Sequence, residues 1–265
     1  MSKHRRTALA FLLAALALAA VAHAQPPTGI SRPPNEQGLG QTELGSQLYA
    51  ANCASCHGIA GRGVQQPGPT RGAANIKGQG PPLVGVGAQA ADLYLTTGFM
   101  PLGNPHEQPW RSRVLFTKRE VSALTNYVAS LGPGPPIPQP NPSAGNVSQG
   151  FHLFTIHCAG CHQVVAEGGY VTDARVPVIK QSTPTQIAEA VRVGPYLMPK
   201  FSKKHISDRQ LNSIIAYLQA SKQPNDRGGW GIGHIGPVPE GMVTWFIAAL
   251  ALVGLCVLIG ERLRA

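Results

Sequence analysis

The stretch "NCASCHG", from Asn52 to Gly58, places two cysteines and a histidine at the spacing Cys-x-x-Cys-His. A second copy, "HCAGCHQ", runs from His157 to Gln163. Two thiols and an imidazole in this order can bind zinc, form a redox disulfide or carry a covalently attached haem. The chain therefore has the same chemistry at two places, and the residues around the motifs decide which chemistry it is.

The surroundings of both motifs favour haem attachment. Zinc would need further Cys or His pairs at ligand spacing, and neither copy has them. A thioredoxin-like dithiol would need a βαβ context, which a chain with 31 Gly and 24 Pro does not offer. In c-type haem attachment each thiol adds across a vinyl group and the adjacent histidine becomes an axial iron ligand. We therefore predict two covalently bound c-type haems. Their attachment and axial residues are Cys53, Cys56 and His57 in the first copy and Cys158, Cys161 and His162 in the second.

Each haem iron needs a sixth ligand, and two methionines stand at matching places. Met100 lies in "TTGFMPLG" and Met198 in "VGPYLMPK", each followed directly by proline. A thioether on a loop stiffened by proline can be held against iron at little entropic cost. We predict these methionines as ligands, with His106 and His205 as alternatives. Histidine–methionine ligation raises the reduction potential and leaves no open iron position, so it indicates electron transfer.

Further contacts are expected around each haem. Pro81 and Pro177 precede their methionines at similar spacing, and a backbone carbonyl at each would fix the orientation of the ligand histidine. Basic side chains available to haem propionates are Arg71, Lys77, Arg175 and Lys180. Ordinary solvent exposure is the commoner explanation of such residues.

The repeat extends on both sides of the motifs. Upstream, "GSQLY" from Gly45 to Tyr49 and "GFHLF" from Gly150 to Phe154 stand at the same distance before the cysteines. Downstream, "TKREVSALTNYVASL" begins at Thr117 and "SDRQLNSIIAYLQAS" begins at Ser207. Both downstream segments open with a capping box and keep apolar residues at helical spacing, so both are predicted to be amphipathic helices.

We expect the downstream helix of each copy to pack against the upstream one. Tyr127 and Tyr217 occupy equivalent places in the downstream helices and would face the upstream helix. Gly45 and Gly150 lack side chains and would let the two backbones approach closely.

These patterns predict a mainly α fold with two tandem class I cytochrome c domains, residues 38–132 and 147–223. Six prolines between Pro133 and Pro142 exclude regular helix or sheet and favour a semi-rigid extended linker over 133–146. A second Gly- and Pro-rich linker covers 224–240, and residues 25–37 are expected to be a leader without fixed structure.

Both ends of the chain indicate export and a membrane. Residues 1–24 have a basic start, an apolar run and a final Ala-His-Ala, as in a signal peptide, with an N-terminal anchor as the alternative. The eighteen residues from Met242 to Ile259 carry no charge and span ~27 Å as a helix, so 241–260 is predicted to be transmembrane. Arg262 and Arg264 follow, which places the C-terminus in the cytoplasm and the haem domains on the external, periplasm-side face of the cell membrane.

No cysteine remains for a structural disulfide, because four lie in the motifs and Cys256 lies in the apolar run. A buried cofactor would then stabilise small exported domains.

The formal net charge is +10, and Lys200, Lys203 and Lys204 follow Met198. These lysines could orient an acidic electron partner, although a solvated basic face explains them equally well. Nucleic acid is not a candidate partner for an exported, anchored chain.

The chain resembles one family closely. Besides the tandem motifs it has "LMPKFS" after the second one and "GHIGPVPEGMVTW", from Gly233 to Trp245, before a single C-terminal membrane helix. These features are similar to the dihaem cytochrome c subunit of the actinobacterial-type menaquinol:cytochrome c reductase, the cytochrome bcc complex. The resemblance covers nearly everything from Gly45 onward.

The resemblance implies a subunit of a proton-translocating quinol:cytochrome c oxidoreductase that has no independent catalytic activity. The implied partners are a cytochrome b subunit, a Rieske iron–sulfur subunit and the copper-bearing subunit of a terminal oxidase. Electrons would enter from the Rieske cluster at the first haem and leave from the second. Two alternatives stay open: a freestanding membrane-anchored dihaem shuttle or oxidase-attached cytochrome, and a dihaem peroxidase. The peroxidase would need an open iron site, against which two methionine ligands argue.

Overall fold

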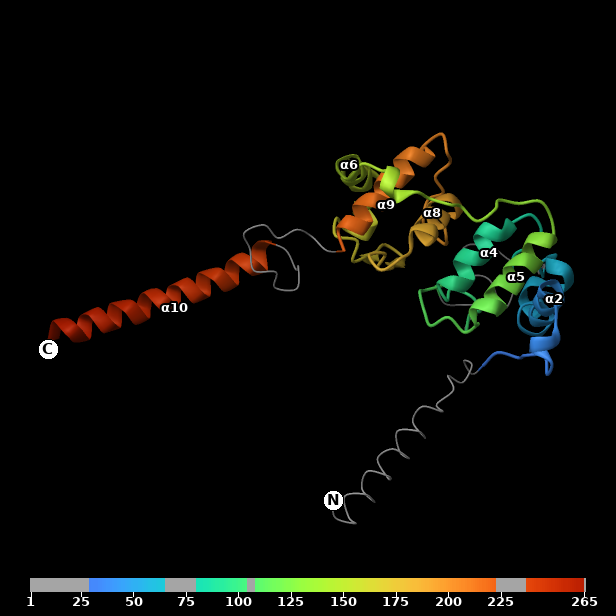
Figure 1. The fold of residues 1–265 in the computed structure, drawn as a ribbon, viewed down its shortest axis with the longest axis horizontal. Coiled ribbons are helices and arrows are strands. Elements are labelled where there is room, and N and C mark those ends of the chain that lie inside the picture. The colour runs from blue at the N-terminus through green and yellow to red at the C-terminus, as the bar shows by residue number, and fades with distance from the viewer. Residues whose placement is uncertain (1–28, 65–79, 104–107, 223–236, 265) are drawn as a thin grey trace, which may run out of the picture. The chain divides into compact units, whose positions relative to one another are not determined.

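The computed structural model describes residues 29–64, 80–103, 108–222 and 237–264 (Figure 1). The chain divides into two compact units, Met1–Tyr217 and Leu218–Ala265. The elements in chain order are η1 (Glu36–Gly38), α2 (Gln41–Asn52), α3 (Ala54–His57), η2 (Ile59–Gly61), α4 (Gly87–Thr96), α5 (Lys118–Ser130), η4 (Pro142–Ala144), α6 (Val147–His157), α7 (Ala159–His162), β1 (Gly169–Val171), β2 (Ala174–Val176), α8 (Pro184–Val193), α9 (Asp208–Ala220) and α10 (Pro237–Arg264). The predicted mainly α fold is confirmed.

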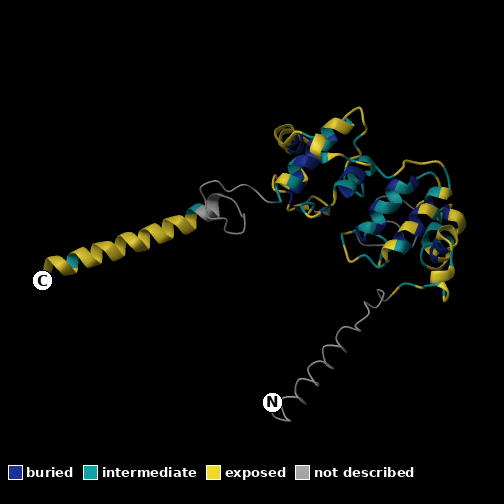
Figure 2. Cartoon of the chain, in the orientation of Figure 1, coloured by how far each residue is buried: buried dark blue, intermediate teal, exposed yellow. Residues whose placement is uncertain are grey.

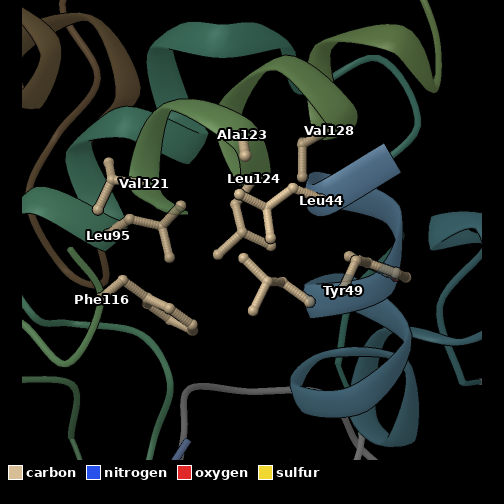
Figure 3. Close-up of a cluster of buried hydrophobic side chains, with 9 residues drawn as sticks. Leu44, Tyr49, Leu95, Phe116, Val121, Ala123, Leu124 and Val128 are labelled. Atoms are coloured by element: carbon tan, nitrogen blue, oxygen red, sulfur yellow. The ribbon is translucent and has the colours of Figure 1, made fainter. Parts of the chain in front are cut away.

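The first cytochrome-like domain is built on α2 packed against α5 (Figure 1). A Cβ atom at Gly45 would lie 2.1 Å from the carbonyl oxygen of Ala123, so only glycine permits this approach. The rings of Tyr49 and Tyr127 lie 5.0 Å apart across the same contact. Side chains of both helices and of the segment before α5 point into one apolar core (Figure 3). The core members are Leu44, Leu48, Tyr49, Leu95, Phe116, Val121, Ala123, Leu124 and Val128.

The second domain repeats this frame with α6 and α9. A Cβ atom at Gly150 would lie 1.9 Å from the carbonyl oxygen of Ser213. The ring of Tyr217 lies 5.5 Å from that of Phe154. The predicted close approach and aromatic contact are therefore confirmed in both copies. The antiparallel hairpin of β1 and β2 is an addition that the helical pattern did not predict.

The predicted capping boxes are present at both downstream helices. The side chain of Thr117 accepts a hydrogen bond from the backbone N–H of Glu120, and the Glu120 carboxylate accepts one from the N–H of Thr117. Ser207 and Gln210 exchange the same two bonds, at 3.3 and 2.8 Å. A third capping box, formed by Thr183 and Gln186 at α8, was not predicted.

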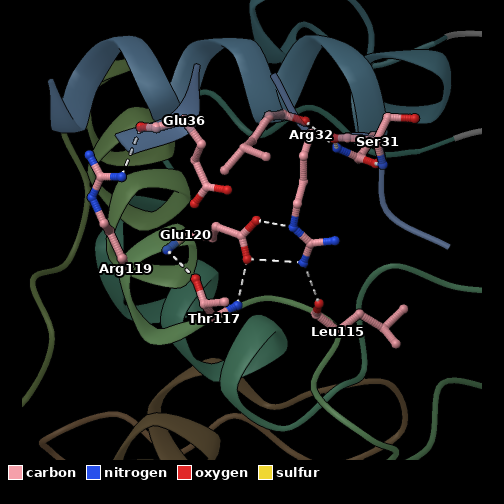
Figure 4. A network of polar contacts seen from close by, with 9 residues as sticks. Ser31, Arg32, Glu36, Leu115, Thr117, Arg119 and Glu120 are labelled. Carbon is pink, nitrogen blue, oxygen red and sulfur yellow. Dashed lines mark hydrogen bonds and ion pairs between the residues drawn. The ribbon is translucent and has the colours of Figure 1, made fainter. Parts of the chain in front are cut away.

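The leader was predicted wrongly for residues 29–37, which are fixed to the first domain. The backbone of Ser31 exchanges hydrogen bonds of 2.8 and 2.9 Å with the side chain of Asn52. The guanidinium of Arg32 lies 2.6 Å from the carboxylate of Glu120, whose side chain is fully buried (Figure 4). Because the charge of Glu120 is buried, it needs a cation beside it, and Arg32 of the leader is that cation.

The proline-rich segment has few internal bonds but is held near both ends. The carbonyl of Pro135 accepts a hydrogen bond of 3.1 Å from the N–H of Gln89. The N–H of Asn141 donates to the side chain of Asn212 at 2.9 Å. Residues 133–141 contain no helix or strand, and the short turn η4 follows.

Helix α10 stands apart in composition. Its stretch Gly241–Arg264 has 24 residues and contains an 18-residue window with a mean hydropathy of 2.6, so it is long and apolar enough to cross a membrane. From Gly241 to Arg264 its side chains are almost all exposed (Figure 2). Among the described residues it is the one helix that meets these conditions. The predicted signal segment 1–24 lies outside the described residues.

Candidate haem sites

The first motif forms a single helical turn directly after α2. The backbone N–H groups of Cys56 and His57 both donate to the carbonyl of Cys53, at 3.1 and 2.9 Å. This turn is α3, and it brings the two thiols and the imidazole onto one short segment. Such a turn can present both thiols to the edge of a planar macrocycle while the histidine projects toward its centre.

The second motif has the same backbone. The N–H groups of Cys161 and His162 donate to the carbonyl of Cys158 at 3.1 and 2.9 Å. This turn is α7, which follows α6 as α3 follows α2. The sequence repeat is therefore a structural repeat down to single hydrogen bonds.

Both motif histidines are oriented by a proline carbonyl, as the sequence predicts. The Nδ1 atom of His57 lies 2.8 Å from the carbonyl oxygen of Pro81. The Nδ1 atom of His162 lies 3.3 Å from that of Pro177. When Nδ1 carries the proton and donates it to the carbonyl, Nε2 keeps a free lone pair for a metal. The motif residues therefore fit a c-type haem iron.

Gly80 shapes the first site in a way that sequence reasoning missed. Its N–H donates to the carbonyl of Cys56 at 2.7 Å. A Cβ atom on Gly80 would lie 2.7 Å from Nδ1 of His57. A side chain there would displace the imidazole, so the glycine lets the Pro81 carbonyl reach the ring. The signal in the sequence was a glycine directly before the proline pair.

One thiol of each motif lies in a strongly desolvated environment. Burial, with a smaller effect of the neighbouring cysteine, raises the pKa of Cys53 and of Cys158 to about 12. None of the five cysteines is joined to another by a disulfide. Within the described part of the chain, no three His, Cys, Asp or Glu side chains come together as a metal site. Burial also lowers the pKa of His162, and its bond to Pro177 opposes this shift.

The two predicted methionine ligands follow equivalent helices. Met100 comes just after α4, and its N–H donates to the carbonyl of Tyr94 at 3.0 Å. Met198 comes just after α8, and its N–H donates to the carbonyl of Pro195 at 3.0 Å. Both side chains are half-buried. Each methionine is thus held by a local backbone bond after its helix.

Of the two alternative ligands, His205 is described, and its side chain is exposed and has a polar partner. The Nδ1 atom of His205 lies 3.0 Å from the hydroxyl of Ser202 on an exposed turn. His106 lies outside the described residues, as do Arg71 and Lys77. Lys203 pairs with Asp208 at 2.8 Å, which uses one lysine of the basic cluster.

The remaining basic residues named for haem propionates have other partners. The ammonium of Lys180 lies 3.2 Å from the Glu167 carboxylate. The guanidinium of Arg175 lies 5.2 Å from the ring centre of Trp110. Contact of either residue with a propionate stays a prediction.

Two tandem helical domains, each with Cys-x-x-Cys-His on one turn and a histidine fixed by a carbonyl, define a c-type cytochrome, in which haem is bound covalently. Residues 42–132 match the family described as "Cytochrome c". Residues 145–218 match the family described as "Cytochrome C oxidase, cbb3-type, subunit III". The predicted pair of cytochrome c domains is thereby confirmed.

Relatives that match along most of the chain place it in a narrower family among the c-type cytochromes. The chain is 32% identical over 255 residues to the "Cytochrome bc1 complex cytochrome c subunit" of Mycobacterium bovis, covering 92% of this chain and 85% of that protein. It is 31% identical over 246 residues to the subunit of the same name from Corynebacterium diphtheriae, covering 86% and 83%. The Mycobacterium leprae subunit is 30% identical over 255 residues, covering 92% and 83%. The chain belongs to the family of cytochrome bc1 complex cytochrome c subunits, and its function is electron transfer.

Proposed function

We propose that this chain is the dihaem electron-transfer subunit of a membrane-bound menaquinol:cytochrome c reductase and has no independent catalytic activity. The observation that carries the proposal is the duplicated site. Both copies have the same one-turn motif, the same carbonyl contact to the histidine and a methionine after the equivalent helix. A chain that carries two such sites, and is related to complex subunits along most of its length, is suited to passing electrons between larger partners.

The first site would hold one haem through Cys53 and Cys56, with His57 and Met100 as ligands of its iron. The second would hold another through Cys158 and Cys161, with His162 and Met198 as ligands. When bound, each haem supplies a one-electron carrier whose iron has no position open to oxygen or peroxide. The residues of the chain attach it, fix the imidazole and provide the thioether. This ligand set argues against the peroxidase alternative.

The proposed partners are cytochrome b, the Rieske iron–sulfur subunit and the copper-bearing subunit of a terminal oxidase. The first two are supported by the relatives, which are named as subunits of a bc1 complex. The chain would pass electrons from the Rieske subunit to the oxidase, entering at the first domain. Helix α10 would anchor the chain in the cell membrane, with the C-terminus cytoplasmic and both domains outside.

Purification of the full chain from its own membranes in mild detergent tests this function. We expect cytochrome b and the Rieske protein to co-purify, and the intact chain to have the mass of the polypeptide plus two haems. Recovery without either partner would favour a freestanding shuttle. A mass with one haem would contradict the dihaem assignment while leaving the complex intact.

A further inference from the structure

Helices α4 and α8 come from different cytochrome c domains and pack against each other. They are equivalent in the repeat, since α4 contains "QAAD" at 89–92 and α8 contains "QIAE" at 186–189. The amide of Gln186 donates to the carbonyl oxygen of Thr96 at 3.2 Å. The amide of Gln89 donates to the backbone carbonyl of Glu189 at 3.5 Å. The two helices that precede the methionines therefore form part of the contact between the domains.

A carboxyl group from each helix lies in this contact. Glu189 is fully buried, and neither of its carboxyl oxygens forms a well-aligned hydrogen bond with a described residue. The charged side chain that acts on it is the carboxyl of Asp92 on α4. A buried carboxylate beside a second carboxylate is unfavourable unless a cation or a proton neutralises it.

The nearby cations are engaged with other groups. Arg111, from the segment before α5, donates to the hydroxyl of Ser182 at 2.8 Å and to the amide oxygen of Gln186 at 3.0 Å. Arg192 on α8 itself pairs with Asp208 at 2.8 Å. Among the described residues, a proton is therefore the remaining way to neutralise Glu189.

The titration of the pair agrees with this geometry. Burial, and then the charge of Asp92, raise the pKa of Glu189 to about 9. Burial also raises the pKa of Asp92, and its interaction with the Glu189 carboxyl opposes that shift. Near neutral pH Glu189 therefore holds a proton.

We propose that Glu189 is a positioning residue that must be protonated for the two cytochrome c domains to pack together, so that their contact strengthens as the surrounding medium becomes more acidic. When the domains separate, Glu189 meets water and titrates near an ordinary value of about 4.3. The packed state then binds one more proton than the separated state. This contribution to packing is complete below the ordinary pKa and is lost as pH rises toward about 9. Quinol oxidation releases protons, so under the function proposed above the contact would respond to acid that the complex itself produces.

The test compares the native full-length holoprotein with Glu189→Gln in urea unfolding, over pH values from about 5 to 9. Glutamine has the shape of the protonated acid but cannot titrate. We expect the unfolding constant of the native chain, relative to that of the variant, to rise by up to about tenfold per pH unit in this window. Glu43→Gln, a substitution of an exposed glutamate on α2, is the matched control and should follow the native profile. Parallel profiles for the native chain and Glu189→Gln would overturn the proposal.

A variant in the first domain tests whether protonation of Glu189 depends on the contact between the domains. Asp92→Asn removes the like charge, so the pH-dependent window should end at a lower pH than in the native chain. Combined with Glu189→Gln it should add no further pH dependence. A native-like profile in Asp92→Asn would show that the proton is not linked to the contact. If Glu189→Gln does not fold, infrared spectra of the native holoprotein decide, because a protonated carboxylic acid band should persist through neutral pH and its absence would overturn the proposal.

Discussion

A tyrosine hydroxyl ties the chain just after the cysteine motif to the helical frame in both domains, but the tyrosine comes from different helices. In the first domain Tyr49 on α2 donates to the carbonyl of Gly58 at 2.8 Å. In the second, Tyr217 on α9 donates to the carbonyl of Val164 at 2.6 Å. The position equivalent to Tyr49 is Phe154, which has no hydroxyl. The repeat thus preserves the bond and not the residue that makes it.

The domains differ more in the contacts made by the capping-box residue at the start of their last helix, Glu120 of α5 and Gln210 of α9. The first uses the leader, whose Arg32 neutralises the buried cap residue Glu120. In the second, the cap residue is Gln210, which carries no charge and needs no cation. Because Gln210 is uncharged, the second domain needs no counterpart of the leader segment that supplies Arg32. Substitutions made in pairs, one in each domain, separate what the repeat shares from what each domain adds.

The largest expected effect is loss of a haem. Replacing Cys53 and Cys56 by alanine should leave a chain with one covalent haem by mass, and replacing Cys158 and Cys161 should do the same. Without a disulfide or a haem, the altered domain should also lose most of its resistance to proteolysis. Cys256→Ala is the control and should retain two haems. Retention of both haems in a motif variant would contradict the assignment of that site.

Changing a methionine tests the sixth ligand in each domain. Met100→Leu or Met198→Leu should lower the reduction potential of one haem and abolish its methionine-to-iron absorption, because thioether ligation raises the potential. Redox titration and absorption spectra of the purified chain provide the measurement. Unchanged spectra would move the ligand to His106 in the first domain or His205 in the second.

The helix pair should respond alike in both domains. Gly45→Ala and Gly150→Ala would place a Cβ atom 2.1 and 1.9 Å from a backbone oxygen of the facing helix. Each should destabilise its domain by about 3 kcal/mol in urea unfolding, since backbone rather than a flexible side chain must move. Gly103→Ala is the control, as a Cβ there meets nothing within 4 Å. A neutral effect in one domain alone would show that the two contacts are not equivalent.

Breaking the leader contact should affect the first domain specifically. Arg32→Met leaves the Glu120 carboxylate buried without its cation and should cost about 3 kcal/mol of unfolding free energy. Burial alone would raise the pKa of Glu120, but bonds from Arg32 and Thr117 lower it overall. The native contribution is therefore present above the ordinary glutamate pKa and is lost as pH falls through the lowered value. Urea unfolding at neutral and acidic pH measures both effects.

The matched change in the second domain is Lys203→Met. This residue pairs with Asp208, whose side chain is 61% exposed. An exposed pair contributes less than about 1 kcal/mol, so its loss should be barely detectable. A cost equal to that of Arg32→Met would mean that burial does not distinguish the two pairs.

The smallest effect tests the tyrosine bond itself. Tyr49→Phe and Tyr217→Phe should each cost about 1 kcal/mol, the usual net value of one hydrogen bond. Tyr127→Phe is the control, because its ring packs at the same contact and the bond to Gly58 is made by Tyr49. Hydrogen exchange at the turn after each motif locates the loss. Greater loss in Tyr127→Phe than in Tyr49→Phe would contradict this assignment.

Much of each site could be predicted because it depends on local patterns. The motif spacing, the capping boxes at Thr117 and Ser207 and the paired glycines are all short-range or repeated signals, and each is present in the structure. The proline carbonyls were predictable because Pro81 and Pro177 recur in register with the motifs. The contact of the leader with the first domain was not predictable. Arg32 has no equivalent in the second copy of the repeat, and its partner Glu120 is 88 residues away in the sequence.

The sequence by itself determined the class of cofactor, the two copies of its attachment motif and the apolar C-terminal helix, because a cofactor-attachment motif and a helical pattern both depend on residues that are close together in the sequence. Only the tertiary structure decided which side chains from distant segments meet. It placed Arg32 against Glu120 and brought Asp92 and Glu189 together between the domains. It also decided that the chain after the motif is bonded by Tyr49 of α2 in the first domain and by Tyr217 of α9 in the second. Charges and hydroxyls act through distance and burial, and neither quantity exists until the chain has folded.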